Sequence, residues 1–170
     1  LFRSISFGVG VPADYAAGEL RLNGATASFE VLRKGKPAGS VSLSVPGRHN
    51  VLNALAALAA AEAVGVAAEV CREALGTFRG TGRRFELLGQ CDGIAVYDDY
   101  AHHPTEIRAT LAAARTFEPK RVIAIFQPHL YSRTRDLEEE FARAFGDADL
   151  VIINDIYAAR EDPMPGVTAE

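Results

Sequence analysis

Apolar and polar positions alternate over two neighbouring segments in the first third of the chain. The alternation is weak over residues 26–32 and clearer over residues 40–45, where Val41, Leu43 and Val45 share one side. A period of two residues is typical of a β-strand with one buried face. Because a Lys-Gly-Lys-Pro turn sequence separates the two segments, we predict a β-hairpin here.

The pattern changes to a helical period after this hairpin. Residues 49–64 are rich in alanine, and apolar residues, including Leu52 and Leu55, recur there every three or four positions. That spacing predicts one long helix, which the glycine at position 65 would end. A second, shorter helix is predicted over residues 67–75.

The second half of the chain alternates apolar segments with helical ones. We predict strands over residues 94–98, 121–126 and 150–155, and helices over residues 104–115 and 135–145. The continuous apolar run that ends at position 126 is typical of a strand in a parallel sheet, which is buried on both faces. The alternation predicts βαβ crossovers, and therefore an α/β fold with a mainly parallel, Rossmann-like sheet.

A segment of different composition separates these two patterns. Residues 76–84 hold three glycines, two threonines and three arginines, a mixture that does not build a core element. We therefore predict a linker, with one domain over residues 1–79 and a second over residues 80–170.

Composition narrows the class of protein. The 170 residues carry a formal charge of −4 and are 48% hydrophobic, which supports a core and argues against disorder. A mildly acidic chain gives no reason to expect a nucleic-acid partner. The longest apolar run, residues 54–61, is too short to cross a membrane. Two cysteines make no disulfide framework, which fits a reducing, cytoplasmic location.

The ends of the chain are unusual for a complete protein. The sequence begins with Leu1 and shows no signal-peptide pattern, and it stops at Glu170 without a terminal motif. We expect the 170 residues to be a fragment of a longer protein.

Polar clusters follow each of the three strands predicted in the second half. In an open parallel sheet, ligands bind beyond the carboxyl ends of the strands. We therefore expect a functional site at this edge of the sheet. The clusters contain Asp98, Asp99, Tyr100, His102 and His103 after the first strand, His129 and Arg133 after the second, and Asp155 and Tyr157 after the third.

Structural and metal-binding interpretations of these clusters stay open at this point. Pro104 and Glu106 suit the first turn of a helix, and Asp98 and Asp99 could be ordinary acids at the end of a strand. A zinc hydrolase could use Asp98, His102, His103 and His129, although their spacing matches no specific ligand pattern.

Two further groups could contact a nucleotide. Asn50 and Asn53 lie three residues apart in the first turn of the long predicted helix, so their amides could face the donor and acceptor edge of adenine or could cap the helix. Arg83 and Arg84 could clamp a phosphate or a carboxylate, or could be solvated charges. A Walker A phosphate loop is absent from the sequence, so a nucleotide-binding module without catalytic activity is a further alternative.

Five motifs taken in order resemble those of the Mur ligase family. They are PGRHNVLNA at 46–54, GTGRRFE at 80–86, YDDYAHHPTE at 97–106, FQPHLYSRT at 126–134 and DIYAARE at 155–161. The match resembles the members that join L-alanine to UDP-N-acetylmuramate. Ligases that recycle muropeptides onto the same sugar share the histidine motif but usually differ at the second and fourth motifs, and they are the alternative.

The resemblance implies an ATP-dependent ligase of peptidoglycan synthesis. In this family the muramyl carboxylate attacks the γ-phosphate of ATP, and the amino-acid amine then displaces phosphate from the acyl phosphate. Residues 1–79 would be the end of the central ATP-binding domain, and residues 80–170 the first part of the C-terminal domain. Mg²⁺ is implied as a cofactor, with ligands mostly outside these residues, so we expect the fragment alone to be inactive.

The resemblance also implies roles for individual residues. Asn50 and Asn53 correspond to adenine contacts, and Arg84 and Asp99 to nucleotide contacts that act in catalysis. The residues placed around the alanine and the acyl group are Tyr100, His102, His129 and Arg133, of which His102 and His129 are also implied in catalysis. Some relatives carry a second arginine where Leu130 stands, so Arg133 would carry more of the contact with the alanine carboxylate. Because these contacts fall on both sides of the linker, catalysis is expected to require closure about residues 76–84.

Overall fold

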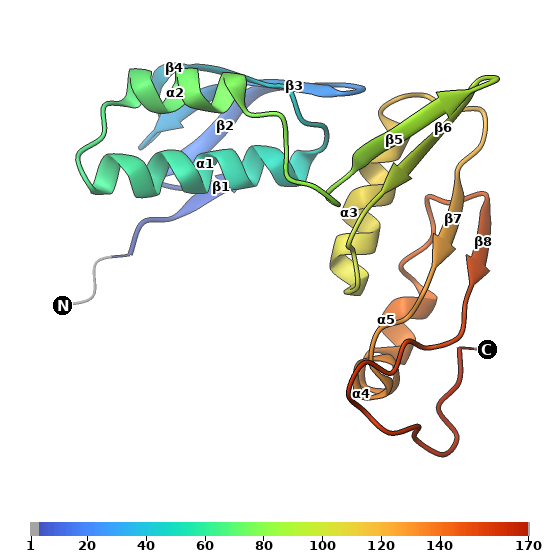
Figure 1. Ribbon diagram of the computed structural model, residues 1–170. Coiled ribbons are helices and arrows are strands. Elements are labelled where there is room, and N and C mark those ends of the chain that lie inside the picture. The colour runs from blue at the N-terminus through green and yellow to red at the C-terminus, as the bar shows by residue number, and fades with distance from the viewer. Residues whose placement is uncertain (1–3, 170) are drawn as a thin grey trace. The chain divides into compact units, whose positions relative to one another are not determined.

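The computed structural model describes residues 4–169. These residues form two compact units, one ending at Thr81 and the other beginning at Gly82 (Figure 1).

The first unit contains a sheet in which the strands follow their chain order. Its strands are β1 (Phe7–Val9), β2 (Tyr15–Asn23), β3 (Thr26–Arg33) and β4 (Lys36–Leu43). β1 runs parallel to β2, and the other neighbours are antiparallel. The predicted hairpin is confirmed as β3 and β4. Lys34 and Gly35 form its turn with φ angles of 51° and 76°, and positive φ at both positions is typical of the tightest hairpins.

The strand β2 was not predicted, because its pairing does not follow a simple alternation. Its register against β3 shifts between Gly18 and Arg21, and Glu19 within that bulge has a φ of 41°. A bulge places an extra residue on one strand and moves the following side chains to the other face. The apolar residues of β2 therefore fall out of phase.

The helices α1 (Arg48–Ala63) and α2 (Ala68–Thr77) cover one face of this sheet (Figure 1). Both predicted helices are confirmed within a residue or two of their expected ends. Val51, Leu55 and Leu58 lie on the buried side of α1 and pack against the sheet residues Val41 and Leu43. Full burial of a side chain of this size contributes about 1.5–3 kcal/mol. This core holds the first turn of α1 in place.

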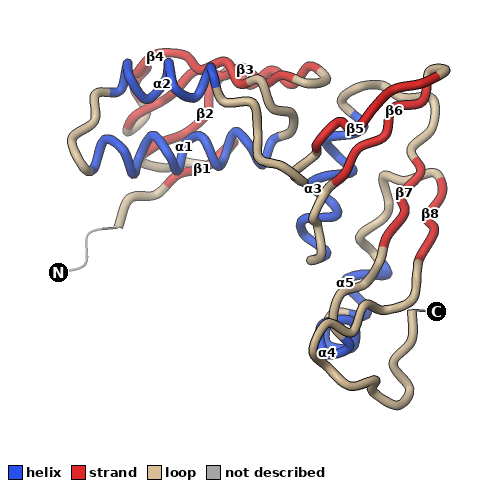
Figure 2. Tube along the Cα trace, viewed as in Figure 1, coloured by secondary structure: helices blue, strands red, loops and turns tan. Residues whose placement is uncertain are grey.

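The second unit combines short strand pairs with helices (Figure 2). Its elements are β5 (Glu86–Cys91), β6 (Ile94–Asp98), α3 (Pro104–Arg115), β7 (Ile123–Phe126), α4 (Tyr131–Asp136), α5 (Glu138–Ala142) and β8 (Leu150–Ile153). β7 and β8 are parallel, with α4 and α5 in the crossover between them. The predicted α/β fold class is confirmed.

The pairing of β6 differs from a simple βαβ arrangement. Among the described residues β6 pairs with β5 in an antiparallel hairpin, and no hydrogen-bonded ladder joins it to β7. Asp92 and Gly93 form the turn, with φ angles of 50° and 78°. β5 was not predicted because all six of its residues are exposed, so that burial imposes no alternation on its sequence.

The helix predicted over residues 135–145 was wrong in its boundaries. The chain becomes helical at Tyr131 and breaks at Leu137, where φ is −118° and ψ is 19°. Three glutamates, residues 138–140, then occupy the first turn of α5. Acidic side chains are favourable at a helix N-terminus, so they stabilise a new start at the point where an uninterrupted helix was expected.

The core of the second unit lies between α3, β7 and the segment after α5. Ile107 and Leu111 of α3 belong to the same buried cluster as Val122, Phe126 and Ala144. This packing fixes the carboxyl end of β7. Throughout residues 4–169, no helix has both the length and the apolar composition needed to cross a bilayer.

Candidate functional site

The three polar clusters expected to meet beyond the strand ends do meet within the second unit. The Tyr100 and His102 rings, after β6, lie with their centroids 5.0 Å apart. The His102 ring lies 6.3 Å from that of His129, which follows β7, and His129 lies 5.5 Å from Tyr157, which follows β8. We call these four residues the ring cluster. In this cluster the two imidazole rings lie between the two tyrosine rings.

Backbone contacts beyond β7 and β8 place the far end of the ring cluster. His129 and Tyr157 form an isolated parallel bridge. Within it the Leu130 N–H donates to the Tyr157 carbonyl oxygen over 2.9 Å, and the Tyr157 N–H donates to the Pro128 carbonyl oxygen over 2.8 Å. The parallel pairing of these strands therefore continues into the site. Tyr157 is 56% exposed, so its side chain is accessible to a ligand.

The start of α4 brings a positive charge to His129. Leu130 has a φ of 75° and turns the chain into α4, after which the Arg133 Nη1 lies 3.4 Å from the His129 Nδ1. Glu161 holds this turn, because its carboxylate accepts hydrogen bonds from the Ser132 N–H, over 2.9 Å, and from the Ser132 hydroxyl. These hydrogen bonds also lower the pKa of the Glu161 carboxyl.

Burial and positive charge both act on His129. Desolvation lowers the pKa of its imidazole, and the neighbouring charges of Arg133 and His102 lower it further. The ring therefore stays neutral down to a lower pH than an ordinary histidine does. A neutral imidazole can accept a proton or a hydrogen bond.

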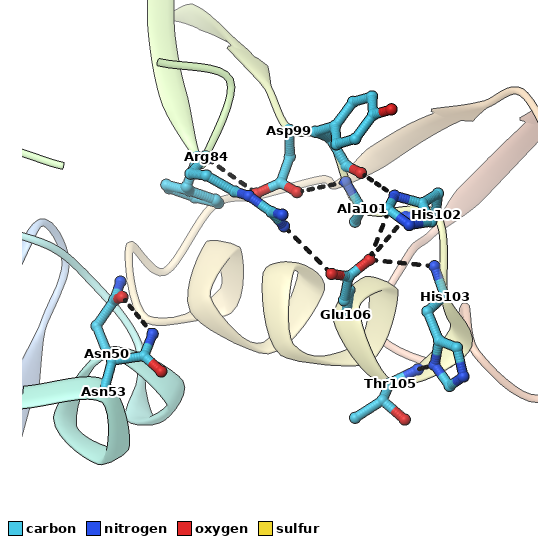
Figure 3. Close-up of polar contacts among 11 residues, drawn as sticks. Asn50, Asn53, Arg84, Asp99, Ala101, His102, His103, Thr105 and Glu106 are labelled. Atoms are coloured by element: carbon cyan, nitrogen blue, oxygen red, sulfur yellow. Dashed lines mark hydrogen bonds and ion pairs between the residues drawn. The ribbon is translucent and has the colours of Figure 1, made fainter. Parts of the chain in front are cut away.

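The two adjacent aspartates at the end of β6 have different partners. Asp98 forms an ion pair with Arg83, with the carboxylate oxygen 3.2 Å from Nε. The Asp99 carboxylate accepts two backbone hydrogen bonds, from the Phe85 N–H over 2.8 Å and from the Ala101 N–H over 2.7 Å (Figure 3). Asp99 thus ties the segment before β5 to the loop after β6.

The two adjacent histidines also differ. The His102 Nδ1 lies 2.8 Å from the Tyr100 carbonyl oxygen. Since a carbonyl oxygen only accepts, Nδ1 carries the proton, and Nε2 is the acceptor of the neutral ring. His103 is the N-cap residue of α3, and its Nδ1 accepts a hydrogen bond from the Thr105 N–H. His102 therefore presents a ring nitrogen to the site, whereas His103 completes a helix.

Glu106 connects this loop to Arg84. Its Oε2 accepts hydrogen bonds from the His102 and His103 N–H groups over 3.0 and 3.2 Å, and its Oε1 lies 3.3 Å from the Arg84 Nη1 (Figure 3). Burial alone would raise the pKa of the Glu106 carboxyl, but the hydrogen bonds from His102 and Arg84, together with their charges, outweigh it and lower the pKa. Sequence reasoning assigned Glu106 only to the start of a helix.

Arg83 and Arg84 both approach the Tyr100 ring. The guanidinium carbon lies 4.8 Å from the ring centroid for Arg83 and 5.9 Å for Arg84. Cation–π contacts at these distances contribute about 0.5–1 kcal/mol at exposed sites. Both arginines therefore border the ring cluster, although their side chains remain 63% and 48% exposed.

The zinc site considered from the sequence finds no support in the geometry. Within residues 4–169, no group of three or more histidine, cysteine, aspartate or glutamate side chains is arranged to hold a metal ion. The His103 Nδ1 is engaged in the helix cap, and Asp98 is paired with Arg83.

Asn50 and Asn53 belong to the first unit, where they line one end of a cavity of about 580 Å³. The remaining walls come mainly from apolar residues of α1, α2 and β4, among them Ala57, Val70 and Leu75. The Asn50 amide nitrogen donates to the Pro46 carbonyl oxygen over 2.8 Å, and the Asn53 amide nitrogen donates to the Asn50 amide oxygen over 3.3 Å. Asn53 is exposed, so its amide is accessible to a ligand.

Comparisons with known proteins agree on one family. The family model described as Mur ligase, glutamate ligase domain, matches residues 83–170. The UDP-N-acetylmuramate–L-alanine ligase of Anaeromyxobacter sp. (strain Fw109-5) is 48% identical over 168 residues, which cover 99% of this chain and 37% of the relative. The chain thus spans little more than a third of the length of that relative.

Two solved structures show the same fold at different degrees of similarity. The UDP-N-acetylmuramate–alanine ligase of Thermotoga maritima is 36% identical, with a TM-score of 0.76 over 90% of this chain and 34% of that one. A murein peptide ligase of Psychrobacter arcticus is 27% identical, with a TM-score of 0.53 over 87% of this chain and 38% of that one. The chain is more similar to the first of these two.

Proposed function

Because the chain belongs to the Mur ligase family, we propose that it is part of an ATP-dependent ligase that joins L-alanine to the carboxylate of UDP-N-acetylmuramate. The observation that carries this proposal is the continuous similarity, over 168 residues and both units, to a ligase of that name. The meeting of three strand ends in the ring cluster supports it, because a ligand site is expected there.

The reaction would proceed in two steps. The muramyl carboxylate would attack the γ-phosphate of ATP and release ADP, and the alanine amine would then attack the acyl carbon and release phosphate. Negative charge collects on phosphoryl and acyl oxygens in both steps, so fixed positive groups are expected to contribute most. Arg84 and Arg133 are the candidates among these residues, and bound Mg²⁺ would supply further neutralisation of the phosphate charge.

We place the alanine at the ring cluster. Arg133 would bind its carboxylate, since a guanidinium matches that group with two donors. His102 and His129 would face the amine and the acyl group, and Tyr100 would border the pocket. A neutral His129 would keep its Nδ1 as the acceptor for Arg133 and would present its Nε2–H as a donor toward an acyl oxygen.

We place the adenine of ATP at Asn50 and Asn53. A purine presents apolar faces and one edge of donors and acceptors. The Asn53 amide oxygen would accept a hydrogen bond from the exocyclic amine, and the apolar lining of the cavity that Asn50 and Asn53 border supports the assignment. Arg84 and Asp99 would contact the phosphate and ribose parts. The Asp99 carboxylate already accepts two backbone N–H groups, so a ribose contact would use its remaining lone pairs.

The proposal includes the domain assignment made from the sequence. Residues 1–79 would be the end of the central ATP-binding domain, and residues 80–170 most of the C-terminal domain. We also propose that the enzyme acts in the cytoplasm, where ATP is available.

The experiment that tests the function is an assay of the full-length ligase containing this segment. ADP release is measured with UDP-N-acetylmuramate and either L-alanine or the tripeptide of a muropeptide. We expect ADP release that depends on both the UDP-sugar and free L-alanine. Preference for the tripeptide would assign the chain to muropeptide recycling, and no release with either acceptor would contradict the ligase function.

A further inference from the structure

Glu106 makes more contacts than a helix start requires. In a capping box, the third residue of the helix accepts a hydrogen bond from the N–H of the N-cap residue, here His103. The same carboxylate oxygen also accepts from the His102 N–H and lies 3.6 Å from the His102 Nδ1. The second oxygen pairs with Arg84. One carboxylate therefore contacts both a proposed nucleotide residue and a proposed alanine residue.

The backbone around Arg84 is held in an unusual conformation. Arg83 and Phe85, on either side of it, have φ angles of 58° and 49°, a region that non-glycine residues rarely adopt. Hydrogen bonds with the loop after β6 hold this segment. The Tyr100 N–H donates to the Arg83 carbonyl oxygen over 2.8 Å, and the Phe85 N–H donates to Asp99. Strain of this kind persists where the surroundings over-determine it, typically at functional sites.

Glu106 restricts the Arg84 side chain, whereas other residues hold the Arg84 backbone. The side chain is 48% exposed, and its ion pair in the described part of the molecule is with Glu106. A long exposed arginine samples many rotamers unless a partner restricts it. The Tyr100 ring, 5.9 Å away, adds a weaker contact. Glu106 is thus the group that selects the direction of the guanidinium.

We propose that Glu106 is a positioning residue that fixes the direction of the Arg84 guanidinium and, through the His102 N–H, the position of the His102 backbone at the same time. The proposal rests on the ligase function proposed above. Glu106 itself contacts neither reacting group. It couples the nucleotide contact to the alanine contact through a single carboxylate on the first turn of α3.

The test uses Glu106→Gln in the full-length ligase. Glutamine keeps an oxygen that can accept the capping hydrogen bonds, since it serves as well as glutamate in a capping box, but it loses the charge that holds Arg84. The matched control is Glu69→Gln, which neutralises a first-turn glutamate of α2 paired with Arg72 over 3.0 Å. Each variant removes one ion pair made by a first-turn glutamate of a helix.

We expect Glu106→Gln to lower kcat/KM for ATP and for L-alanine by about tenfold each. Its melting temperature should stay within about 2 °C of that of Glu69→Gln, because each exposed pair contributes little to stability. The control should retain kcat/KM within about twofold. Unchanged kinetic constants in Glu106→Gln, or a loss explained by unfolding, would overturn the positioning role.

A double-mutant cycle with Arg84→Gln separates positioning from capping. If Glu106 acts on the nucleotide through Arg84, adding Glu106→Gln to Arg84→Gln should change kcat/KM for ATP by less than about twofold. Additive losses would mean that Glu106 acts elsewhere.

Calorimetry of ATP binding distinguishes a failure of the positioning role from a failure of the proposed ligase function. Weaker ATP binding by Glu106→Gln would support positioning even if L-alanine were not the acceptor, and unchanged binding would contradict it.

Discussion

Neighbouring residues of the same type have different roles at the residue scale. Asp98 pairs with Arg83, whereas Asp99 accepts two backbone hydrogen bonds. The proton of the neutral His102 ring is on Nδ1, and in His103 that nitrogen is instead an acceptor. Both members of each pair belong to a sequence motif. Their hydrogen-bond and ion-pair partners in the structure show which of the two contributes to the site and which supports the fold around it.

His129 provides a residue-scale prediction about pH. Its imidazole pKa should lie below the usual value of about 6.5, because burial and the charges of Arg133 and His102 disfavour the protonated ring. Arg133→Gln removes one of these charges and should raise the His129 pKa toward the usual value. NMR titration of ¹³C-labelled histidines in the full-length ligase would measure both.

The sign of this shift also fixes its effect on stability. A histidine whose pKa is lower in the folded state stabilises the protein fully above its unfolded pKa, and that contribution is lost as pH falls through the folded value.

The matched control for Arg133→Gln in the titration is Arg143→Gln, since Arg143 pairs with Glu139 on the exposed side of α5. A His129 pKa at or above the usual value in the wild type would contradict the prediction.

The residues of the candidate site could be predicted from the sequence only where they belong to polar clusters after apolar strands. His102, His129 and Arg133 are such residues, and the structure brings His102 and His129 into one ring cluster with Arg133 beside them. Glu106 was hidden, because a glutamate in a first helical turn is ordinary. Its contact with Arg84 spans 22 positions, and no local pattern reports such a contact.

At the scale of elements, the same limit separates the strands that were predicted from those that were not. α1 and β4 bury one face, so their sequences repeat with the period of the structure. β5 is exposed at every position, and β2 contains a bulge. Where a strand is not buried on one face, or where its register shifts, its apolar residues do not recur every second position, and the strand cannot be predicted from that pattern.

Element α1 carries a stability prediction. Leu55→Ala should reduce the free energy of unfolding by about 2–5 kcal/mol, because truncation leaves a cavity in a packed core. Leu55 has no exposed surface, whereas Val64, one residue beyond α1, is 81% exposed. Val64→Ala is the control and should change the free energy by less than about 0.5 kcal/mol. Urea unfolding followed by circular dichroism would measure both variants, and equal losses would contradict the assigned core.

At the scale of the whole molecule, the second unit exposes an unusual amount of apolar surface. Ile94 and Val96 of β6 and Ile123 and Ile125 of β7 are all exposed, and Ile125 reaches 72%. The continuous apolar run of β7 predicted a strand buried on both faces. That expectation is wrong for residues 4–169, where Ile123 and Ile125 are both exposed.

The proposed function separates binding of the UDP-sugar from the chemical step, and Arg84 offers a way to observe that separation. We propose that the UDP-sugar is bound by residues outside this segment, whereas Arg84 would contact the nucleotide. Arg84→Ala should therefore lower kcat by about 100-fold, as loss of a group that stabilises transition-state charge commonly does, and should leave the Kd for UDP-N-acetylmuramate within about twofold. Steady-state kinetics and calorimetry would measure the two quantities.

The control for this prediction is Arg108→Ala, which removes an exposed arginine of α3 whose hydrogen bond goes to the Thr105 hydroxyl over 3.4 Å. Both quantities should stay near the wild-type values in this variant, because the side-chain hydrogen bond of Arg108 in the described residues goes to Thr105 and not to the ring cluster or Glu106. If Arg84→Ala weakened sugar binding as much as it slowed ligation, the residue would act through the fold of the enzyme. A selective loss of kcat instead requires that the guanidinium act after the UDP-sugar has bound, which is where charge develops on the transferred phosphoryl group.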